Sequence, residues 1–561
     1  MSRRRAGASP ARRRTTSSSS VGGLGGWPTR TSGVHPTNGV PRPPRIASGY
    51  PRARVGFTRD PAAAAGLGRG PSRATVEEWR PPSLTEARPR RTFRPSCGGA
   101  VLKVDDELDQ VTVAKVYEAE QEHVFRFWGQ LSTEQRRALL EQLRSFDLQL
   151  LGRLVRKLEP VARSEGVFEP VPPQRFAPER RAELEALGWE ALAAGKVACL
   201  VVAGGQGTRL GWPHPKGTYP VGPVSGKSLF RLFAEQLRAT ARRAGTAPDL
   251  YVLTSAQNRA ETEAYFAQHD RFGLEPERLF FLTQAELPNT DARGKLLLAE
   301  KHRVATSPDG HGGAFLALQR AGALERMAER GQELLFYWQV DNPLCRVADP
   351  AFLGAHLAAA AEASTKVVEK EEPEEKVGLL VQREGQTRVV EYSELDPALQ
   401  AERDPRGRLR YRAGNTAIHL FSRSFLARLA NERFRLDYHV ARKAIPCVDD
   451  DGKPVQPREP NGIKFEAFIF DLLPQARGHV AFAIDREEEF EPLKNAEGPC
   501  SPESVRRALS ERARRWLLEA GFAPRPEVTY EVSPLRALDP TELAQRLEAL
   551  PEPQEGRVAI E

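Results

Sequence analysis

The sequence predicts an α/β protein in which a mostly parallel, Rossmann-like β-sheet is covered by helices on both faces. From Lys196 onward, short and continuously apolar runs alternate with longer helical patterns. Such runs are typical of parallel strands, because those strands are buried on both faces. A glycine-rich turn follows the first run, and Asp341 follows the fourth. Both lie just beyond a strand's carboxyl end, where sheets of this class bind ligands.

The elements of this sheet are expected in a regular order. Three of the apolar runs are followed by an amphipathic helical pattern, and the run before the long loop at 284–333 is the exception. The predicted strands lie at 196–202, 250–255, 278–283 and 334–340, and the predicted helices at 227–243, 258–269 and 351–363.

A helical segment is expected before the sheet, from about Asp105. Ser132 and Gln135 have the spacing of a capping box, in which two side chains satisfy free amides at a helix start. Apolar residues then recur at steps of four, three and four, which predicts one face of an amphipathic helix. These residues are Leu139, Leu143, Phe146 and Leu150.

The first hundred residues differ from the rest in composition and charge. They hold 19 arginines, no lysine and four acidic residues, whereas the whole chain has a formal net charge of +8, so residues 101–561 carry about −7. So little apolar surface cannot offset the entropy lost on ordering, and the tail is expected to be disordered. Three interpretations stay open: a flexible extension or a stretch upstream of the true start, an organelle transit peptide, and an arginine-rich nucleic-acid-binding arm.

The composition excludes several classes of protein. Five scattered cysteines without a CxxC pair argue against a disulfide framework and a zinc module, and they suit a reducing cytosol. No apolar run approaches the roughly 18 residues of a membrane span. A folded part with negative net charge argues against a nucleic-acid enzyme. We therefore expect a cytoplasmic protein with no membrane and no nucleic-acid partner.

The glycine-rich turn predicts a phosphate site. Gly204, Gly205 and Gly207 allow the backbone to approach a ligand closely, and successive amides can face phosphate oxygens. Arg209 and Lys216 would add the fixed positive charge that a triphosphate needs.

Two similar motifs do not match. The turn is not GxGxxG, because that spacing would need glycine at Leu210. The segment from Gly222 to Ser228 is one residue too short for a Walker A motif and follows no apolar strand. We expect its lysine, Lys227, to be solvated or to support the structure.

The string AGGQGTRLG at 203–211, with Pro215-Lys216-Gly217, resembles the signature of the sugar-nucleotide pyrophosphorylases. The form with Gln206 is similar to the UDP-N-acetylhexosamine branch. The resemblance extends from about Asp105 to Ala520, and motifs such as VDNPL look closer to bacterial members. It implies a GT-A-like nucleotidyltransferase fold that transfers a uridylyl group from UTP to N-acetylglucosamine 1-phosphate with Mg²⁺.

The resemblance also implies roles for individual residues. Gly204, Gly205, Gln284 and Gly310 would bind the nucleotide, with Gln284 reading the uracil edge. Arg209, Lys216 and Lys494 would be catalytic, and Asp341 would bind the metal. The sugar would be contacted by His311, Gly378, Glu391, Asn415 and Lys464.

Several of these residues have plainer interpretations. Gln284 and His311 could face water, and Asp341 could cap a helix, although Asp349 fits that role better. Glu391 could be a solvated acid on an edge strand, and Lys494 a surface charge. His311 replaces the asparagine of better-known relatives, and Arg412 departs from them too, so the identity of the sugar stays open.

The chain is thus expected to have four parts: a disordered tail (1–100), a helical N-terminal element (105–190), a catalytic domain (191–500) and a short C-terminal segment (501–561). Eukaryotic relatives carry a further β-rich C-terminal domain, whereas this chain keeps EVSPL at 531–535 and then an acidic, helix-like stretch. We expect a monomer or weak homo-oligomer. The alternatives are another substrate, namely N-acetylgalactosamine, glucose or galactose 1-phosphate, and a non-catalytic UDP-sugar-binding protein.

Overall fold

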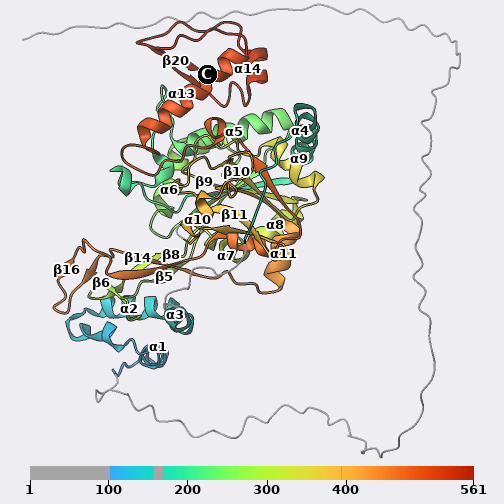
Figure 1. Cartoon of the computed structure of the whole chain (residues 1–561). Helices are drawn as coiled ribbons and strands as arrows, with labels where there is room; N and C mark the ends of the chain where they lie inside the picture. The colour runs from blue at the N-terminus through green and yellow to red at the C-terminus, as the bar shows by residue number, and fades with distance from the viewer. Residues whose placement is uncertain (1–101, 157–167, 393) are drawn as a thin grey trace, which may run out of the picture. The chain divides into compact units, whose positions relative to one another are not determined.

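A ten-stranded mixed β-sheet is the central element of the computed structural model, which describes residues 102–156, 168–392 and 394–561 (Figure 1). The predicted disordered tail lies outside the described residues. The main path of the sheet runs through β1 (Glu169–Pro170), β11 (Leu379–Arg383), β13 (Ala413–Ser422), β9 (Leu334–Gln339), β2 (Val197–Val202), β3 (Asp249–Thr254) and β4 (Leu279–Thr283). Off this path lie β12 (Gln386–Val390) on β11, β10 (Ala363–Glu369) on β13, and β18 (His479–Ala483) on β10.

The sheet has a parallel half and a largely antiparallel half. Strands β9, β2, β3 and β4 pair in parallel, and they are the four strands that the sequence predicts. Strand β13 pairs antiparallel with β9, β10 and β11, while β10 and β18 are parallel. The predicted α/β fold class is confirmed, and the carboxyl ends of four neighbouring strands meet at one edge.

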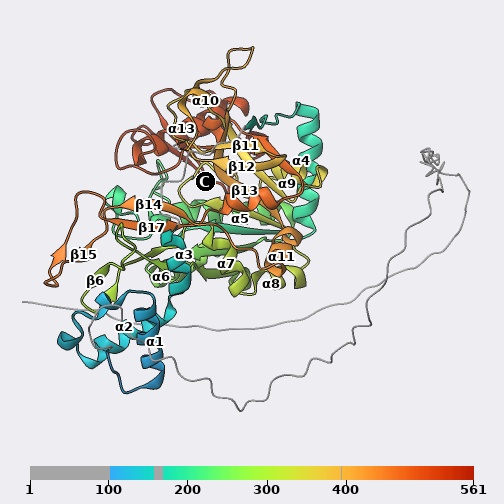
Figure 2. The ribbon, with the colours of Figure 1, turned by 60° about the horizontal axis from the view of Figure 1, so that its bottom comes forward.

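Helices cover both faces of the sheet, as Figures 1 and 2 show. Alternate residues of β2 point to opposite faces: Cys199 lies in one core and Leu200 in the other. The first face is covered by α4 (Pro178–Ala193), α5 (Leu229–Ala244), α6 (Arg259–Gln268), α9 (Pro350–Ala358) and α13 (Pro502–Glu519). The second is covered by α7 (Gly313–Arg320), α8 (Ala323–Glu329), α11 (Arg423–Asn431) and the 3₁₀ segment η7 (Ile469–Gln475).

The N-terminal helices pack on short strands rather than on the sheet. The predicted capping box of Ser132 and Gln135 is present at the start of α2. The predicted long helix is wrong in part, because α2 ends before Phe146 and Leu150 belongs to the next helix. The helices are α1 (Glu107–Glu118), α2 (Thr133–Ser145) and α3 (Leu148–Arg156), and they share a core with β6 (Leu298–Glu300), β7 (Arg303–Val304), β15 (Cys447–Val448) and β17 (Gly462–Glu466).

The fourth helix, α4, packs on the central sheet instead. A β-carbon on Gly188 of α4 would lie 1.9 Å from the carbonyl oxygen of Pro350, and one on Gly354 of α9 would lie 1.8 Å from that of Leu184. The two glycines let α4 and α9 pack backbone against backbone. The expected helical element at 105–190 therefore divides into α1–α3 and a helix that is part of the sheet's cover.

The C-terminal segment is folded around a small core of its own. Helix α13 packs against β19 (Thr529–Val532), β20 (Arg557–Ile560) and α14 (Pro540–Arg546), and β19 pairs in parallel with β20. The remaining elements are short: β5 (Glu286–Pro288) with β8 (Thr306–Pro308), β14 (His439–Lys443) with β17, β16 (Pro454–Val455) with β15, and helices α10 (Pro397–Ala401) and α12 (Arg486–Glu489).

Candidate active site

The glycine-rich turn leaves β2 at the carboxyl edge of the sheet. It folds back on the PKG segment, because the amide of Gly207 donates to His214 O (2.9 Å) and that of Lys216 donates to Gly205 O (3.1 Å). Gly205 is exposed, and nothing lies within 4 Å of where its β-carbon would stand. The turn therefore presents bare backbone to solvent, as a phosphate site requires.

Gly204 and Gln284 form a niche at the ends of three parallel strands. A β-carbon on Gly204 would lie only 2.5 Å from Oε1 of Gln284, so glycine is needed for this approach. Gln284 is buried, and its backbone amide donates to Thr254 O at 2.9 Å. The hydroxyl of Ser255, beside Gly204, has no hydrogen-bond partner in the part of the chain that the structure describes. An amide and a hydroxyl in one niche can read the edge of a base, and Gln284 does not face water as in the plainer interpretation.

Lys216 and Asp341, two of the predicted site residues, lie side by side although they come from distant segments of the chain. Nζ of Lys216 lies 4.0 Å from Oδ2 of Asp341, and their side chains are 19% and 14% exposed. The same ammonium donates to Leu493 O (3.1 Å), while the amide of Leu493 donates to Asp341 O (2.7 Å). Lys494 follows Leu493 directly. The segment 492–495 (PLKN) therefore lies against the segments 215–217 (PKG) and 340–342 (VDN).

Arg209 and Lys494 contribute free cations. Arg209 lies on the 3₁₀ turn after the glycines, and both side chains are exposed. Neither forms an ion pair with any residue in the described ranges. Because an unpaired surface cation is available to a ligand, both placements are compatible with contact to phosphate groups.

Asp341 fits the expected Mg²⁺ ligand. It follows β9, and Asp349 rather than Asp341 caps α9, accepting from the amide of Ala351 at 3.2 Å. No group of three histidine, cysteine or acidic side chains within 102–156, 168–392 and 394–561 could hold a metal. Mg²⁺ is commonly held by one or two carboxylates together with substrate phosphates and water. A single carboxylate beside a phosphate site therefore suits this ion, and the metal itself stays a prediction.

Three of the predicted sugar contacts lie together. The amide of Asn415 donates to Gly378 O (2.8 Å), and a β-carbon on Gly378 would lie 3.2 Å from Oε1 of Glu391. Burial, and then the neighbouring Glu394, raise the pKa of Glu391, while His439 and Lys494 act to lower it.

His311 is held by a backbone amide and an aromatic ring. The amide of Ile469 donates to Nδ1 (3.2 Å), and the imidazole stacks on Phe468 with ring centroids 5.2 Å apart. Burial lowers the pKa of His311 to about 4, so the ring is neutral at pH 7. Because Nδ1 accepts, the proton must lie on Nε2. His311 therefore offers a donor, as the asparagine of relatives would.

Two predicted residues are explained by packing. Gly310 has φ +87°, and its β-carbon would lie 2.4 Å from Ala467 O, so the protein itself occupies the space beside it. Lys464, on β17, pairs with Glu466 of the same strand at 2.8 Å. These contacts account for both residue types without a ligand, and the predicted nucleotide and sugar contacts of Gly310 and Lys464 stay predictions.

The sequence did not single out His439. This residue of β14 stacks on Phe468, with ring centroids 4.4 Å apart, and its Nε2 lies 2.8 Å from the carboxylate of Asp471. Although burial lowers the pKa of His439, its bond to Asp471 raises it, and the net shift is upward. A lone histidine between Tyr438 and Val440 carries no motif signal, so only the fold reveals it.

The Walker-like segment binds an internal carboxylate. Glu531 of β19 accepts from the amides of Val224 and Ser225, both at 2.8 Å. Lys227 is buried and pairs with Glu235 at 2.9 Å and Glu561 at 3.0 Å. The supporting role expected for Lys227 is confirmed, whereas its expected solvation is wrong.

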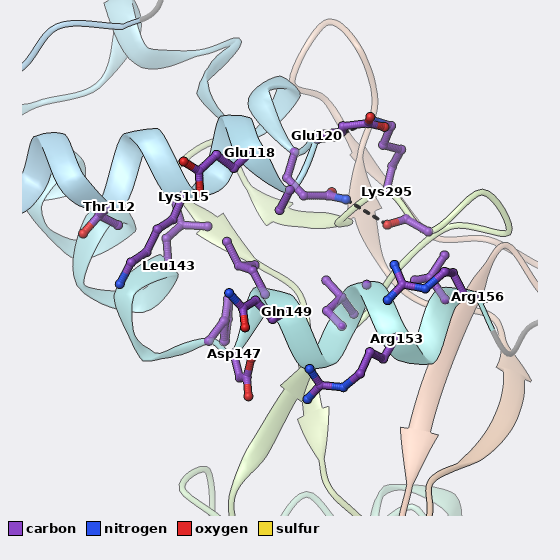
Figure 3. A pocket seen from close by; sticks show the side chains of 18 of the residues that line it. Thr112, Lys115, Glu118, Glu120, Leu143, Asp147, Gln149, Arg153, Arg156 and Lys295 are labelled. Atoms are coloured by element: carbon purple, nitrogen blue, oxygen red, sulfur yellow. Dashed lines mark hydrogen bonds between the residues drawn. The ribbon is translucent and has the colours of Figure 1, made fainter. Parts of the chain in front are cut away.

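A separate cavity of about 960 Å³ lies among α1, α2, α3 and the loop at 293–295 (Figure 3). Its charged lining has both signs, with Lys115, Arg153 and Arg156 opposed by Glu118 and Asp147. None of the predicted site residues lines it.

The chain is similar to several known proteins. The family model described as UTP--glucose-1-phosphate uridylyltransferase (UDPGP) matches residues 165–545. The human UDP-N-acetylhexosamine pyrophosphorylase-like protein 1 is 41% identical over 437 residues, covering 74% of this chain and 86% of that protein. The UDP-N-acetylglucosamine pyrophosphorylase of Saccharomyces cerevisiae is 36% identical over 441 residues, covering 74% and 92%.

A solved structure is similar as well. The crystal structure of the uridine diphosphate N-acetylglucosamine pyrophosphorylase from Trypanosoma brucei in complex with inhibitor matches with a TM-score of 0.70 and 28% identity, covering 82% of this chain and 99% of that chain. These relatives are all eukaryotic, so the expected likeness to bacterial members has no support among them. No helix in the described part of the chain is long and apolar enough to cross a membrane.

Proposed function

The chain belongs to the UTP--glucose-1-phosphate uridylyltransferase (UDPGP) family, and we propose that it converts UTP and N-acetylglucosamine 1-phosphate into UDP-N-acetylglucosamine and pyrophosphate. The observation that carries this proposal is the meeting of Lys216, Asp341 and the Lys494 segment beside the niche of Gly204 and Gln284. Relatives named UDP-N-acetylglucosamine diphosphorylase or pyrophosphorylase, at 35–37% identity, support the choice of substrate.

The proposed reaction needs no protein nucleophile. A phosphate oxygen of the sugar 1-phosphate forms a bond to the α-phosphorus of UTP, and the bond from that phosphorus to the oxygen bridging to the β-phosphate breaks. Pyrophosphate leaves with the bonding electrons. The attacking phosphate is already an anion, so no proton has to be removed, and positioning with electrostatic stabilisation supplies the catalysis.

The residues of this chain divide the work by their position. Gln284 and Gly204 would hold the uracil edge, and the bare backbone at Gly205 would approach the phosphates. Arg209, Lys216 and Lys494 would stabilise the charge that develops on the transferred and departing phosphates. Asp341 would hold Mg²⁺, which when bound supplies positive charge to the phosphate oxygens.

The sugar cluster supports an N-acetylated hexose. Glu391 and the backbone around Gly378 and Asn415 present acceptors to hydroxyl groups, and Nε2 of His311 is a donor suited to an acetyl carbonyl. N-acetylgalactosamine, glucose or galactose 1-phosphate would change the contacts but not the reaction. A non-catalytic binding protein would be expected to lose charged residues at these positions, whereas Arg209, Lys216, Asp341 and Lys494 are all present, which favours an enzyme.

We also propose a cytoplasmic protein that is a monomer or a weak homo-oligomer. The four cysteines within the described ranges are all free, two of them buried, which suits a reducing compartment. Size-exclusion chromatography with light scattering at micromolar concentration tests the oligomeric part of the proposal.

The experiment offers the full chain UTP, Mg²⁺ and, in parallel, N-acetylglucosamine, N-acetylgalactosamine, glucose and galactose 1-phosphates, and measures pyrophosphate release. Release with the N-acetylated sugars supports the proposal, and chelation of the metal should abolish it. Release only with glucose or galactose 1-phosphate would overturn the substrate. A folded protein that binds UTP without any release would favour the binding-protein alternative.

A further inference from the structure

A buried lysine lies behind the candidate active site. Lys366, on β10, is completely buried, and its ammonium lies 2.7 Å from the carboxylate of Asp349 and forms a second ion pair with Glu489. Asp349 and Glu489 are buried as well. Although burial by itself lowers the pKa of Lys366, the two carboxylates raise it above its usual value. Lys366 is therefore charged in the folded protein.

Two partly buried arginines lie next to this network. Arg346 is close enough for Asp349 and Glu489 to raise its pKa against the effect of burial. Arg512, from α13, donates to the backbone carbonyls of Leu344 (2.9 Å) and Glu488 (3.2 Å). Because a buried ion pair seldom stabilises a fold more than apolar residues of similar volume would, stability alone does not explain such a cluster.

The network is linked to the active site through the chain that follows Glu489. Asn342 donates to the carbonyl of Glu489 (2.7 Å) and accepts from the amide of Glu491 (3.2 Å). Two residues later the amide of Leu493 donates to Asp341 O. Both ends of the segment 489–493 are therefore held in place. Glu489 forms an ion pair with Lys366, and Leu493 is hydrogen-bonded to the backbone of Asp341.

The last hydrogen bond of this series is made by Lys216, which is proposed to be catalytic. The carbonyl of Leu493 accepts from Nζ of Lys216 at 3.1 Å, and Lys494 follows directly. A shift of the segment at Glu489 would therefore move the hydrogen-bond acceptor of Lys216 and the ammonium of Lys494 together. Misplacement by about 1 Å can lower a rate by roughly 10²-fold.

We propose that Lys366 is a positioning residue for uridylyl transfer, which holds the segment 489–494 through Glu489 and so places Lys494 and Leu493 against Asp341 and Lys216. This inference rests on the proposed function. Lys366 touches no substrate in this scheme, and it acts only through the groups that it fixes. Asp349, its other partner, caps α9 and anchors the lysine to the scaffold.

The test removes the ion pair between Lys366 and Glu489 while keeping the size of the side chain at position 489. Glu489→Gln removes the charge that Lys366 holds, retains the side-chain volume and leaves the Lys366–Asp349 pair intact. The matched control is Glu488→Gln on the same helix, whose carboxylate binds Arg515 (2.6 Å) and Trp516 (2.9 Å) of α13 instead. Steady-state kcat and KM for UTP are measured for the wild type and both variants.

We expect Glu489→Gln to lower kcat about tenfold or more with KM for UTP little changed, because the base niche lies at other strand ends. The control should keep wild-type kcat. Combined with Lys494→Ala, the Glu489→Gln substitution should cost less than the product of the two single losses, since both act on one group. A merely structural role predicts independent losses that multiply.

Two results would overturn the inference: wild-type kcat in folded Glu489→Gln, or losses that multiply fully in the double variant. If Glu489→Gln does not fold, Asn342→Ala is tested instead. This variant removes the hydrogen bonds of Asn342 to the backbone of Glu489 and Glu491 without leaving a buried charge. Wild-type kcat in Asn342→Ala would count against the proposal. An inactive wild type would instead overturn the proposed function, so the two failures are distinguishable.

Discussion

The ammonium of Lys216 lies 4.0 Å from the carboxylate of Asp341, although one residue follows the glycine-rich turn and the other ends β9. The pair is partly exposed, and it sits where Leu493 crosses between them. In this arrangement the carboxylate of Asp341 and the carbonyl of Leu493 orient the ammonium of Lys216 while a phosphate is absent. A ligand with several negative charges could then draw the ammonium away from Asp341, which leaves the carboxylate to a metal ion.

Lys216→Ala should reduce kcat for pyrophosphate release by roughly 10²-fold or more, because it removes a preorganised charge partner of the phosphates. Steady-state kinetics with UTP and N-acetylglucosamine 1-phosphate measure the loss. Lys196→Ala is the control, since that lysine forms only an exposed pair with Glu333 (3.1 Å). A Lys216→Ala enzyme with the kcat of the control would remove Lys216 from the mechanism.

Gly204→Ala should weaken binding of UTP. The new β-carbon would lie 2.5 Å from Oε1 of Gln284, so the amide would have to leave its position. We expect KM for UTP to rise about tenfold or more, on the scale of a lost hydrogen bond to a buried polar group. Gly129→Ala is the matched control, because nothing lies within 4 Å of its β-carbon. Equal KM values for the two variants would contradict a base niche at this position.

His311→Leu should raise KM for the sugar 1-phosphate by about tenfold, because it removes the Nε2 donor while filling a similar volume. His311→Asn should recover most of that loss, since an amide can also donate. KM for UTP, measured on the same enzymes, serves as the internal control. If leucine and histidine prove equivalent for the sugar, Nε2 of His311 makes no substrate contact.

Stability should fall as the pH is lowered from about 6.5 toward 4. Burial lowers the pKa of His356 to about 4 and that of His479 to about 3, and burial also holds the pKa of His419 well below its usual value. In this window the unfolded chain binds protons at these histidines that the folded chain does not. Their contribution is therefore complete above pH 6.5 and is lost on acidification. His311, whose pKa burial also lowers to about 4, adds to this effect, whereas Asp309, whose pKa burial raises to about 7, and His439, whose pKa is raised by Asp471, oppose it.

Urea unfolding at pH 7.5 and pH 5.0 measures the effect. His356→Gln should show a smaller loss of unfolding free energy between the two pH values than the wild type, because one of these histidines is absent. Among the described residues, its imidazole bonds to the hydroxyls of Ser364 (2.8 Å) and Ser422 (3.0 Å), and His356 is none of the residues assigned to the substrates. An equal loss in the two proteins would show that His356 is not kept neutral by the fold.

The sequence by itself determined the elements and the chemistry of the site. Continuous apolar runs identified β2, β3, β4 and β9, because a strand buried on both faces needs apolar residues at every position. The glycine string, Gln284 and Asp341 could be placed at strand ends, since each follows such a run directly. Local order along the chain carries this information, and the family resemblance added the roles.

Only the tertiary structure decided which of these residues meet. No local pattern shows that Leu493 bridges Lys216 and Asp341, that Glu531 fills the Walker-like turn, or that Lys227 and Lys366 are buried among carboxylates. The long helix predicted across Phe146 failed for the same reason, because α2 and α3 share one apolar core through a turn. Charges and glycines that look alike in a sequence acquire different roles through partners distant in the chain, and those partners are set by packing.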